Sequence, residues 1–99
     1  MSSNRLVIEG EVVALDLLRY TPAGIPLVNI TFRHTSIQNE AGMKRQAECE
    51  VQAVAMDELA KKAAKLSIGE QVKVAGFLAR KSLKNDRLML HILELETVN

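Results

Sequence analysis

Apolar and polar residues alternate along most of the chain, and this pattern predicts β-strands. From Leu6 to Ala14 every even position is apolar or glycine, while Glu9 and Glu11 occupy odd positions, which is the period of a half-buried strand. The same alternation predicts four further strands, over residues 27–35, about 44–53, 71–80 and 88–96. Between the third and fourth strands, apolar residues recur at helical spacing from Met56 to Leu66, which indicates one short helix.

The segments between these elements carry turn signals. Gly10, in the middle of the first strand, predicts a bulge or bend by which one long strand joins both sheets of a small barrel. We expect a turn over residues 21–26, because its two prolines and its glycine cannot continue a strand, and loops over the polar stretches 36–42 and 81–87. The order β-β-β-α-β-β predicts an all-β fold, a five-stranded OB-fold barrel with one short helix between strands 3 and 4, as a single domain over residues 1–99. An SH3-like or other small barrel is the alternative, which the position of the helix disfavours.

The inward positions of these strands predict the core. Cys49 alternates with small apolar residues of the third strand, and we expect its thiol to be buried. In the fifth strand the apolar series breaks into a shifted pair, Leu93 and Leu95. The residues of the second and fourth strands expected inside the barrel are Val28, Ile30, Phe32, Val72, Val74 and Leu78.

Composition narrows the class of protein. At 99 residues, with 47% hydrophobic and 25% charged residues, the chain can close one hydrophobic core. A single cysteine cannot form an internal disulfide, which fits a reducing cytoplasm. There is no secretory signal pattern and no apolar run of about 20 residues, so we expect a soluble cytoplasmic protein with no membrane partner.

The sequence offers little catalytic chemistry. His34 and His91 lie on separate strands, without a nearby carboxylate or nucleophile motif, and we interpret both as structural or surface polar residues. No glycine-rich phosphate loop precedes a helix, and one cysteine with two histidines does not suggest a zinc site. The sequence therefore predicts a protein that is not an enzyme and holds no metal or cofactor.

Charge distribution gives the one direct functional signal. The net charge is only +1, but cations are concentrated in residues 80–87, where Asp86 is the only acid. Flexible cations in such a loop can follow a phosphate backbone without reading base sequence, although a solvated hairpin tip would have a similar composition. Cations near strands two and three would extend this surface, interrupted by Glu48 and Glu50. The residues concerned are Arg80, Lys81, Lys84 and Arg87 in the loop, and Arg33, Lys44 and Arg45 on or near the two strands.

An ordered series of short motifs resembles the primosomal replication protein N (PriB) family, which is related to single-stranded DNA-binding protein. The series spans nearly the whole chain and keeps the expected spacing. Its elements are Asn4-Arg5-Leu6-Val7, Pro22-Ala23-Gly24-Ile25-Pro26, His34 with Ser36 and Gln38, Glu40-Ala41-Gly42, Arg45-Gln46-Ala47 before Cys49, Gly76-Phe77 and Leu90-His91.

The resemblance implies a homodimeric OB-fold that binds single-stranded DNA in bacterial replication restart, in the nucleoid-associated cytoplasm. Its implied partners are the restart helicase PriA and the protein DnaT, between which it would act as a bridge. The basic loop of the family maps onto Lys81, Lys84 and Arg87, and further basic positions of the family map onto Arg45 and Arg19.

Two departures from the family pattern weaken the expected DNA contact. Met43 and Glu48 stand where the family pattern has aromatic residues, and base stacking is worth about 1–3 kcal/mol per base. We therefore expect modest, mainly ionic binding. The alternative is a protein adaptor that stimulates the restart helicase, with marginal DNA binding.

Overall fold

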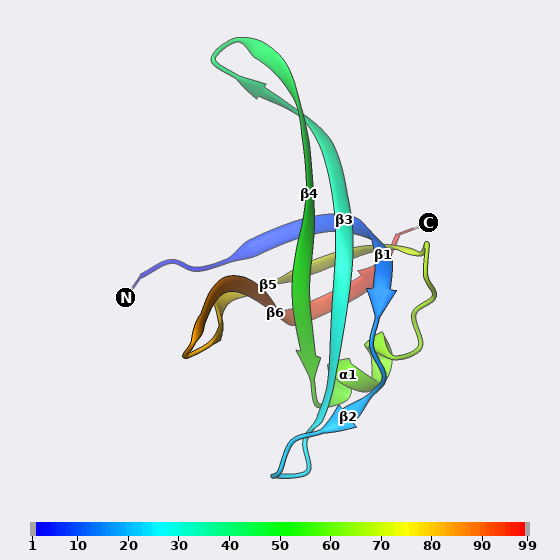
Figure 1. The fold of residues 1–99 in the computed structure, drawn as a ribbon. Coiled ribbons are helices and arrows are strands. Elements are labelled where there is room, and N and C mark those ends of the chain that lie inside the picture. The colour runs from blue at the N-terminus through cyan, green and yellow to red at the C-terminus, as the bar shows by residue number, and fades with distance from the viewer. Residues whose placement is uncertain (1, 99) are drawn as a thin grey trace.

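The structure, a computed structural model, describes residues 2–98 and forms a closed β-barrel with one short helix (Figure 1). No helix within these residues is long and apolar enough to cross a bilayer. The elements are β1 (Leu6–Leu15), β2 (Arg19–Tyr20), β3 (Pro26–Glu40), β4 (Met43–Met56), α1 (Glu58–Ala63), β5 (Gln71–Ser82) and β6 (Asn85–Thr97). The five long strands and the helix follow the predicted order, so the predicted OB-fold is confirmed; only the two-residue β2 is additional.

The first strand closes the barrel. In the sheet order β1-β5-β6-β4-β3-β2, β1 pairs with β5 through its first half and with β3 through its second. Gly10 lies where the partner changes, and a Cβ there would be 3.0 Å from the Arg33 carbonyl oxygen. The register shift itself falls between Val12 and Ala14. It reverses the alternation, so that Leu15 packs against the core and Ala14 is exposed, contrary to the predicted parity.

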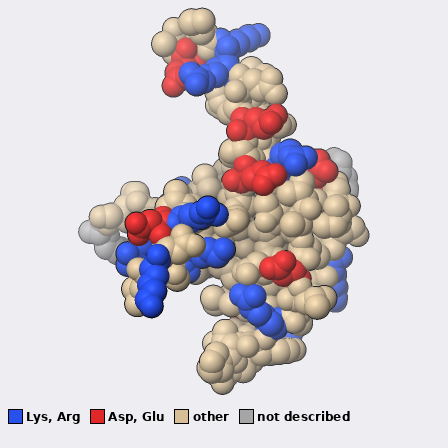
Figure 2. Space-filling view, viewed as in Figure 1, with Lys and Arg blue, Asp and Glu red and all other residues tan. Residues whose placement is uncertain are grey.

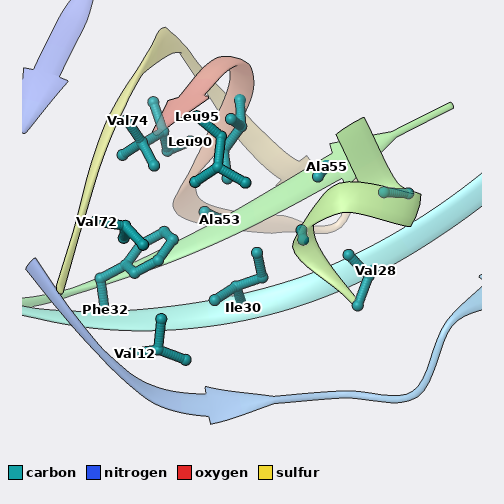
Figure 3. Packing of buried hydrophobic residues seen from close by; sticks show 13 residues of the cluster. Val12, Val28, Ile30, Phe32, Ala53, Ala55, Val72, Val74, Leu90 and Leu95 are labelled. Atoms are coloured by element: carbon teal, nitrogen blue, oxygen red, sulfur yellow. The ribbon is translucent and has the colours of Figure 1, made fainter. Parts of the chain in front are cut away.

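The core fills the barrel interior with branched aliphatic side chains around Phe32, which is only 1% exposed (Figure 3). The inward residues predicted for the second strand are all buried, and Val72, Val74, Leu90 and Ile92 join them from β5 and β6. The helix contributes Ala60 and Ala63 to the same cluster, because the small side chains let it lie close to the barrel.

The β3–β4 hairpin is longer than predicted. We expected a loop over residues 36–42, but β3 and β4 stay paired as far as Glu40 and Met43, and the hairpin projects from the barrel as an arm (Figure 1). Cys49 is exposed, so the prediction of a core thiol is wrong. On the arm, the inward parity of β4 has no opposite sheet against which to pack, and burial begins only near Val51.

The second half of the chain also differs from prediction in detail. The helix is shorter than the predicted segment 56–66. Met56 still belongs to β4, and the helix ends at Ala63. The expected loop 81–87 is almost entirely strand, and only Leu83 and Lys84 form the turn. Leu93 is the extra residue of a bulge in β6, since Ala75 pairs with Glu94 and the next residue of β5 pairs with Ile92. The bulge explains the shifted pair: Leu95 is buried and Leu93 is exposed.

Candidate nucleic-acid interface

A groove lies between the β5–β6 hairpin and the outer face of the sheet formed by β3 and β4. It consists of two hollows of about 100 and 190 Å³ that share Asn29, Lys81 and Met89, and we call it the hairpin groove. The first hollow is also bordered by Asp16, Ile30, Thr31, Gln52 and Ala53, and the second by Arg19, Leu27, Val54, Met56 and His91.

A row of side chains crosses four strands, and its first three members line the groove. Backbone register places Asn29 of β3 beside Val54 of β4, Val54 beside His91 of β6, and His91 beside Phe77 of β5. These residues face away from the core, because their strand neighbours Val28, Ala55 and Leu90 point into it. Val54 and Met89 are nonetheless only 6% and 7% exposed, which gives the groove an apolar floor.

Two of the predicted cations border this floor from different elements. Arg19 comes from β2 at the edge of the sheet, and Lys81 comes from the end of β5. Both are exposed, and neither forms an ion pair with any residue between 2 and 98. Cations along a groove can follow the phosphate backbone of a single nucleic-acid strand, and an apolar floor can contact its bases.

The tip of the β5–β6 hairpin carries the other cations of the predicted loop. Lys84 lies in the turn and Arg87 follows it, both exposed and without a carboxylate partner in the described chain. Arg80 is 3.7 Å from Asp86, a weak pair because both side chains are largely exposed. The Asn85 side-chain oxygen accepts a hydrogen bond from the Arg87 backbone N–H, which holds the turn. Figure 2 shows positive side chains gathered on this hairpin.

The arm is less favourable to DNA than the hairpin. Arg33 is 3.3 Å from Glu50, and Arg45 is 3.1 Å from Glu40, so both predicted site residues have carboxylate partners. Strand alternation places Lys44 on the face of the arm that carries Arg33, and Arg45 on the opposite face. Three arm cations, Arg33, Lys44 and Arg45, were predicted together as one surface, but the structure places Arg45 on the other face.

The acids Glu48 and Glu50 share this face of the arm with Arg33 and Lys44. Glu50 lies directly opposite Arg33, and Glu48 lies between Glu50 and Lys44 along β4. Negative side chains accordingly mark the base of the arm in Figure 2. The predicted site residues therefore divide into Arg19, Lys81, Lys84 and Arg87, at the groove and hairpin tip, and a more distant or paired set, Arg33, Lys44, Arg45 and Arg80.

Sequence reasoning missed the ring pair beside the groove. The His91 and Phe77 rings are stacked, with centroids 4.8 Å apart and planes 7° from parallel. The outward parity of both residues was readable from the sequence, but the cross-strand register that pairs them was not. His34 is structural, as predicted: its Nδ1–H donates to the Glu9 carbonyl oxygen at 2.7 Å and its Nε2 accepts from Ser36 Oγ at 2.8 Å.

Among residues 2–98, histidine, cysteine and carboxylate side chains form no cluster that could hold a metal ion.

Comparison with known proteins identifies the family to which the chain is related. Residues 4–94 match the model of a family described as another single-strand binding protein family. Replication restart protein PriB of Nitrosomonas europaea is 36% identical over 93% of this chain and 85% of its own length, and PriB of Proteus mirabilis is 33% identical over 100% and 97%. The structure of PriB from Ralstonia solanacearum superposes with a TM-score of 0.90 at 34% identity, over 99% of this chain and all of that one. The small single-stranded DNA-binding protein of Streptomyces coelicolor shares the fold, with a TM-score of 0.76 at 18% identity over 99% of this chain and 95% of its own.

The barrel and its groove therefore define an OB-fold of the single-strand binding type. The family that the chain matches is one of single-strand binding proteins, and the prediction of a non-enzymatic protein is confirmed. The chain belongs to this single-strand binding family and, within it, to the replication restart proteins PriB.

Proposed function

We propose that the chain acts as one OB-fold domain that binds single-stranded DNA along the hairpin groove, as an accessory protein of the replication-restart primosome. The observation that carries this proposal is the position of Lys81 and Arg19 at the border of a groove with Val54 and Met89 in its floor, with Lys84 and Arg87 unpaired beside it within the described residues. A single strand would lay its bases on the sheet and its phosphates along these cations. Arg33, Lys44, Arg45 and Arg80 would make secondary contacts, because three of them must first leave a carboxylate partner.

Salt dependence tests the proposal directly. Each neutralised phosphate of a single strand contributes about −0.7 to the slope of log K against log salt. Four contacting cations therefore predict about 50-fold weaker binding between about 50 and 200 mM salt. The measurement is a titration of a fluorescently labelled oligonucleotide with the protein at the two salt concentrations. An affinity that does not change with salt, or no binding at the lower salt concentration, would contradict ionic binding in the hairpin groove.

We further propose that the protein is a homodimer that bridges the restart helicase PriA to DnaT in the nucleoid-associated cytoplasm. Support for the dimer comes from β1, whose first half pairs with β5 on one edge only, since pairing with β3 begins at Glu11. An unpaired strand edge is a template for a second copy of the chain. The partners and the location rest on family membership.

Sedimentation velocity tests both parts of this assembly. The chain alone, at micromolar concentration, is expected to sediment as a dimer, and labelled PriA or DnaT is expected to sediment faster when the chain is added. A clean monomer would refute the dimer. Partners whose sedimentation does not change would refute the bridge.

The second candidate is a protein adaptor with marginal DNA binding. Its specific support is the acidic pair Glu48 and Glu50 on the arm, together with the carboxylate partners of Arg33 and Arg45. A complex with PriA that forms normally, while the oligonucleotide fails to bind, would favour this candidate.

A further inference from the structure

Few rings in this chain are available to stack on a nucleobase. The sequence holds one tyrosine, two phenylalanines, two histidines and no tryptophan. Phe32 is in the core, and both ring nitrogens of His34 are engaged in hydrogen bonds. Tyr20 is exposed but does not border the hairpin groove. The stacked pair of Phe77 and His91 remains.

The geometry of this pair leaves one ring face toward the groove. Phe77 and His91 lie directly opposite each other on neighbouring strands, and their centroid separation of 4.8 Å matches the spacing between strands. The stack therefore runs across the sheet. The next position in that direction belongs to Val54, which is beside His91 on β4 and has no ring. One face of the His91 ring therefore packs against Phe77, and the other face is toward the space above the short side chain of Val54.

The hollow above Val54 has the size and lining of a small binding slot. Its volume is about 190 Å³, and Met56 and Leu27 add apolar surface. Asn29 offers an amide donor and acceptor at the same hollow, which can hydrogen-bond to the edge of any base. Arg19 and Lys81 border it as well, within reach of the phosphates of a nucleotide seated there.

We propose that a nucleobase of the bound strand occupies the hollow above Val54, stacked on the imidazole of His91. Phe77 is the positioning residue that holds this imidazole parallel to the base. The proposal rests on single-stranded DNA binding in the groove and deepens it: this slot supplies stacking on a chain that has Met43 and Glu48 where the family pattern has aromatic residues.

The test separates base contact from phosphate contact. His91→Ala is expected to bind oligo(dT) about 5- to 150-fold more weakly than the original protein, which is the effect of losing one stacked base. The slope of log K against log salt should stay nearly unchanged, because Arg19, Lys81 and the other groove cations still contact the phosphates. His91→Phe should retain affinity within about threefold, since it keeps a ring. Tyr20→Ala, which removes an exposed ring outside the groove, is the matched control and should bind normally.

A tryptophan at position 91 gives a second readout that does not depend on affinity. His91→Trp would carry the only tryptophan of the chain. Its fluorescence should be quenched by oligo(dT) and remain unchanged with an abasic strand of the same length and charge, because only a base can stack on the indole.

The outcomes distinguish this inference from the proposed function. If the original protein binds oligo(dT) and the abasic strand equally well, or if His91→Ala binds normally, the base slot is wrong and ionic binding in the groove stands. If the original protein binds neither strand, both proposals fail. Thermal unfolding of each variant shows whether a loss of affinity reflects a loss of fold.

Discussion

Replacing Lys81, Lys84 and Arg87 together with alanine is expected to weaken binding to single-stranded DNA about 100-fold at roughly 0.1 M salt. These residues are the hairpin cations that have no carboxylate partner in the part of the chain that the structure describes. Each lost phosphate contact removes a released counterion, so the slope of log K against log salt should fall by about 2. The measurement is an oligonucleotide titration at several salt concentrations.

The matched control removes the same charge elsewhere. Lys61, Lys65 and Lys73 lie on α1, on the segment after it and near the start of β5, and none of them borders the hairpin groove. Their triple alanine variant should keep most of the affinity and nearly the full salt slope. Equal losses in the two variants would mean that net charge, and not the groove, attracts the strand.

Gly76→Ala is expected to produce the largest loss of stability of any single substitution considered for this protein. A Cβ on Gly76 would overlap the His91 carbonyl oxygen and would lie 2.8 Å from its carbonyl carbon. Both atoms belong to backbone, so no side-chain rotation relieves the clash. We expect the free energy of unfolding to fall by about 3 kcal/mol or more, a large part of the total for a domain of this size.

Urea unfolding followed by circular dichroism measures this effect, and Gly24→Ala is the control. Gly24 has a φ of 84°, but a Cβ there would meet no atom within 4 Å. Its substitution should therefore cost only the conformational penalty of about 1–2 kcal/mol. Equal losses at the two positions would show that the close approach of β6 does not set the requirement for glycine at position 76.

The sequence predicted the fold well, because a strand that lines a filled barrel needs an apolar residue at every second position. Val28, Ile30 and Phe32 face a filled barrel, and their period of two was sufficient to place the strand. The arm escaped prediction because its residues bury little, and backbone pairing alone extends the strands through Ser36 and Gln38. Cys49 was misplaced for the same reason: alternation identifies a face but not whether anything covers it.

The sequence predicted only the part of the candidate site whose charged residues are close together along the chain. Lys81, Lys84 and Arg87 are neighbours along the chain, and their cluster could be recognised without coordinates. The meeting of Lys81 with Arg19 at one groove depends on how β2 and β5 sit around the barrel. The stacking of Phe77 on His91 depends on a register that a bulge shifts nearby, and local sequence does not encode that register.

The double pairing of β1 has a consequence for biosynthesis. Its second half pairs with β3, but its first half pairs with Gln71–Gly76, which the ribosome synthesises much later than β1 and β3. The barrel therefore cannot close during translation until β5 has emerged from the ribosome. Until then Leu6 and Ile8 remain uncovered in the nascent chain. A chain that stalls before β5 therefore exposes an unpaired apolar strand, which can aggregate with other nascent chains.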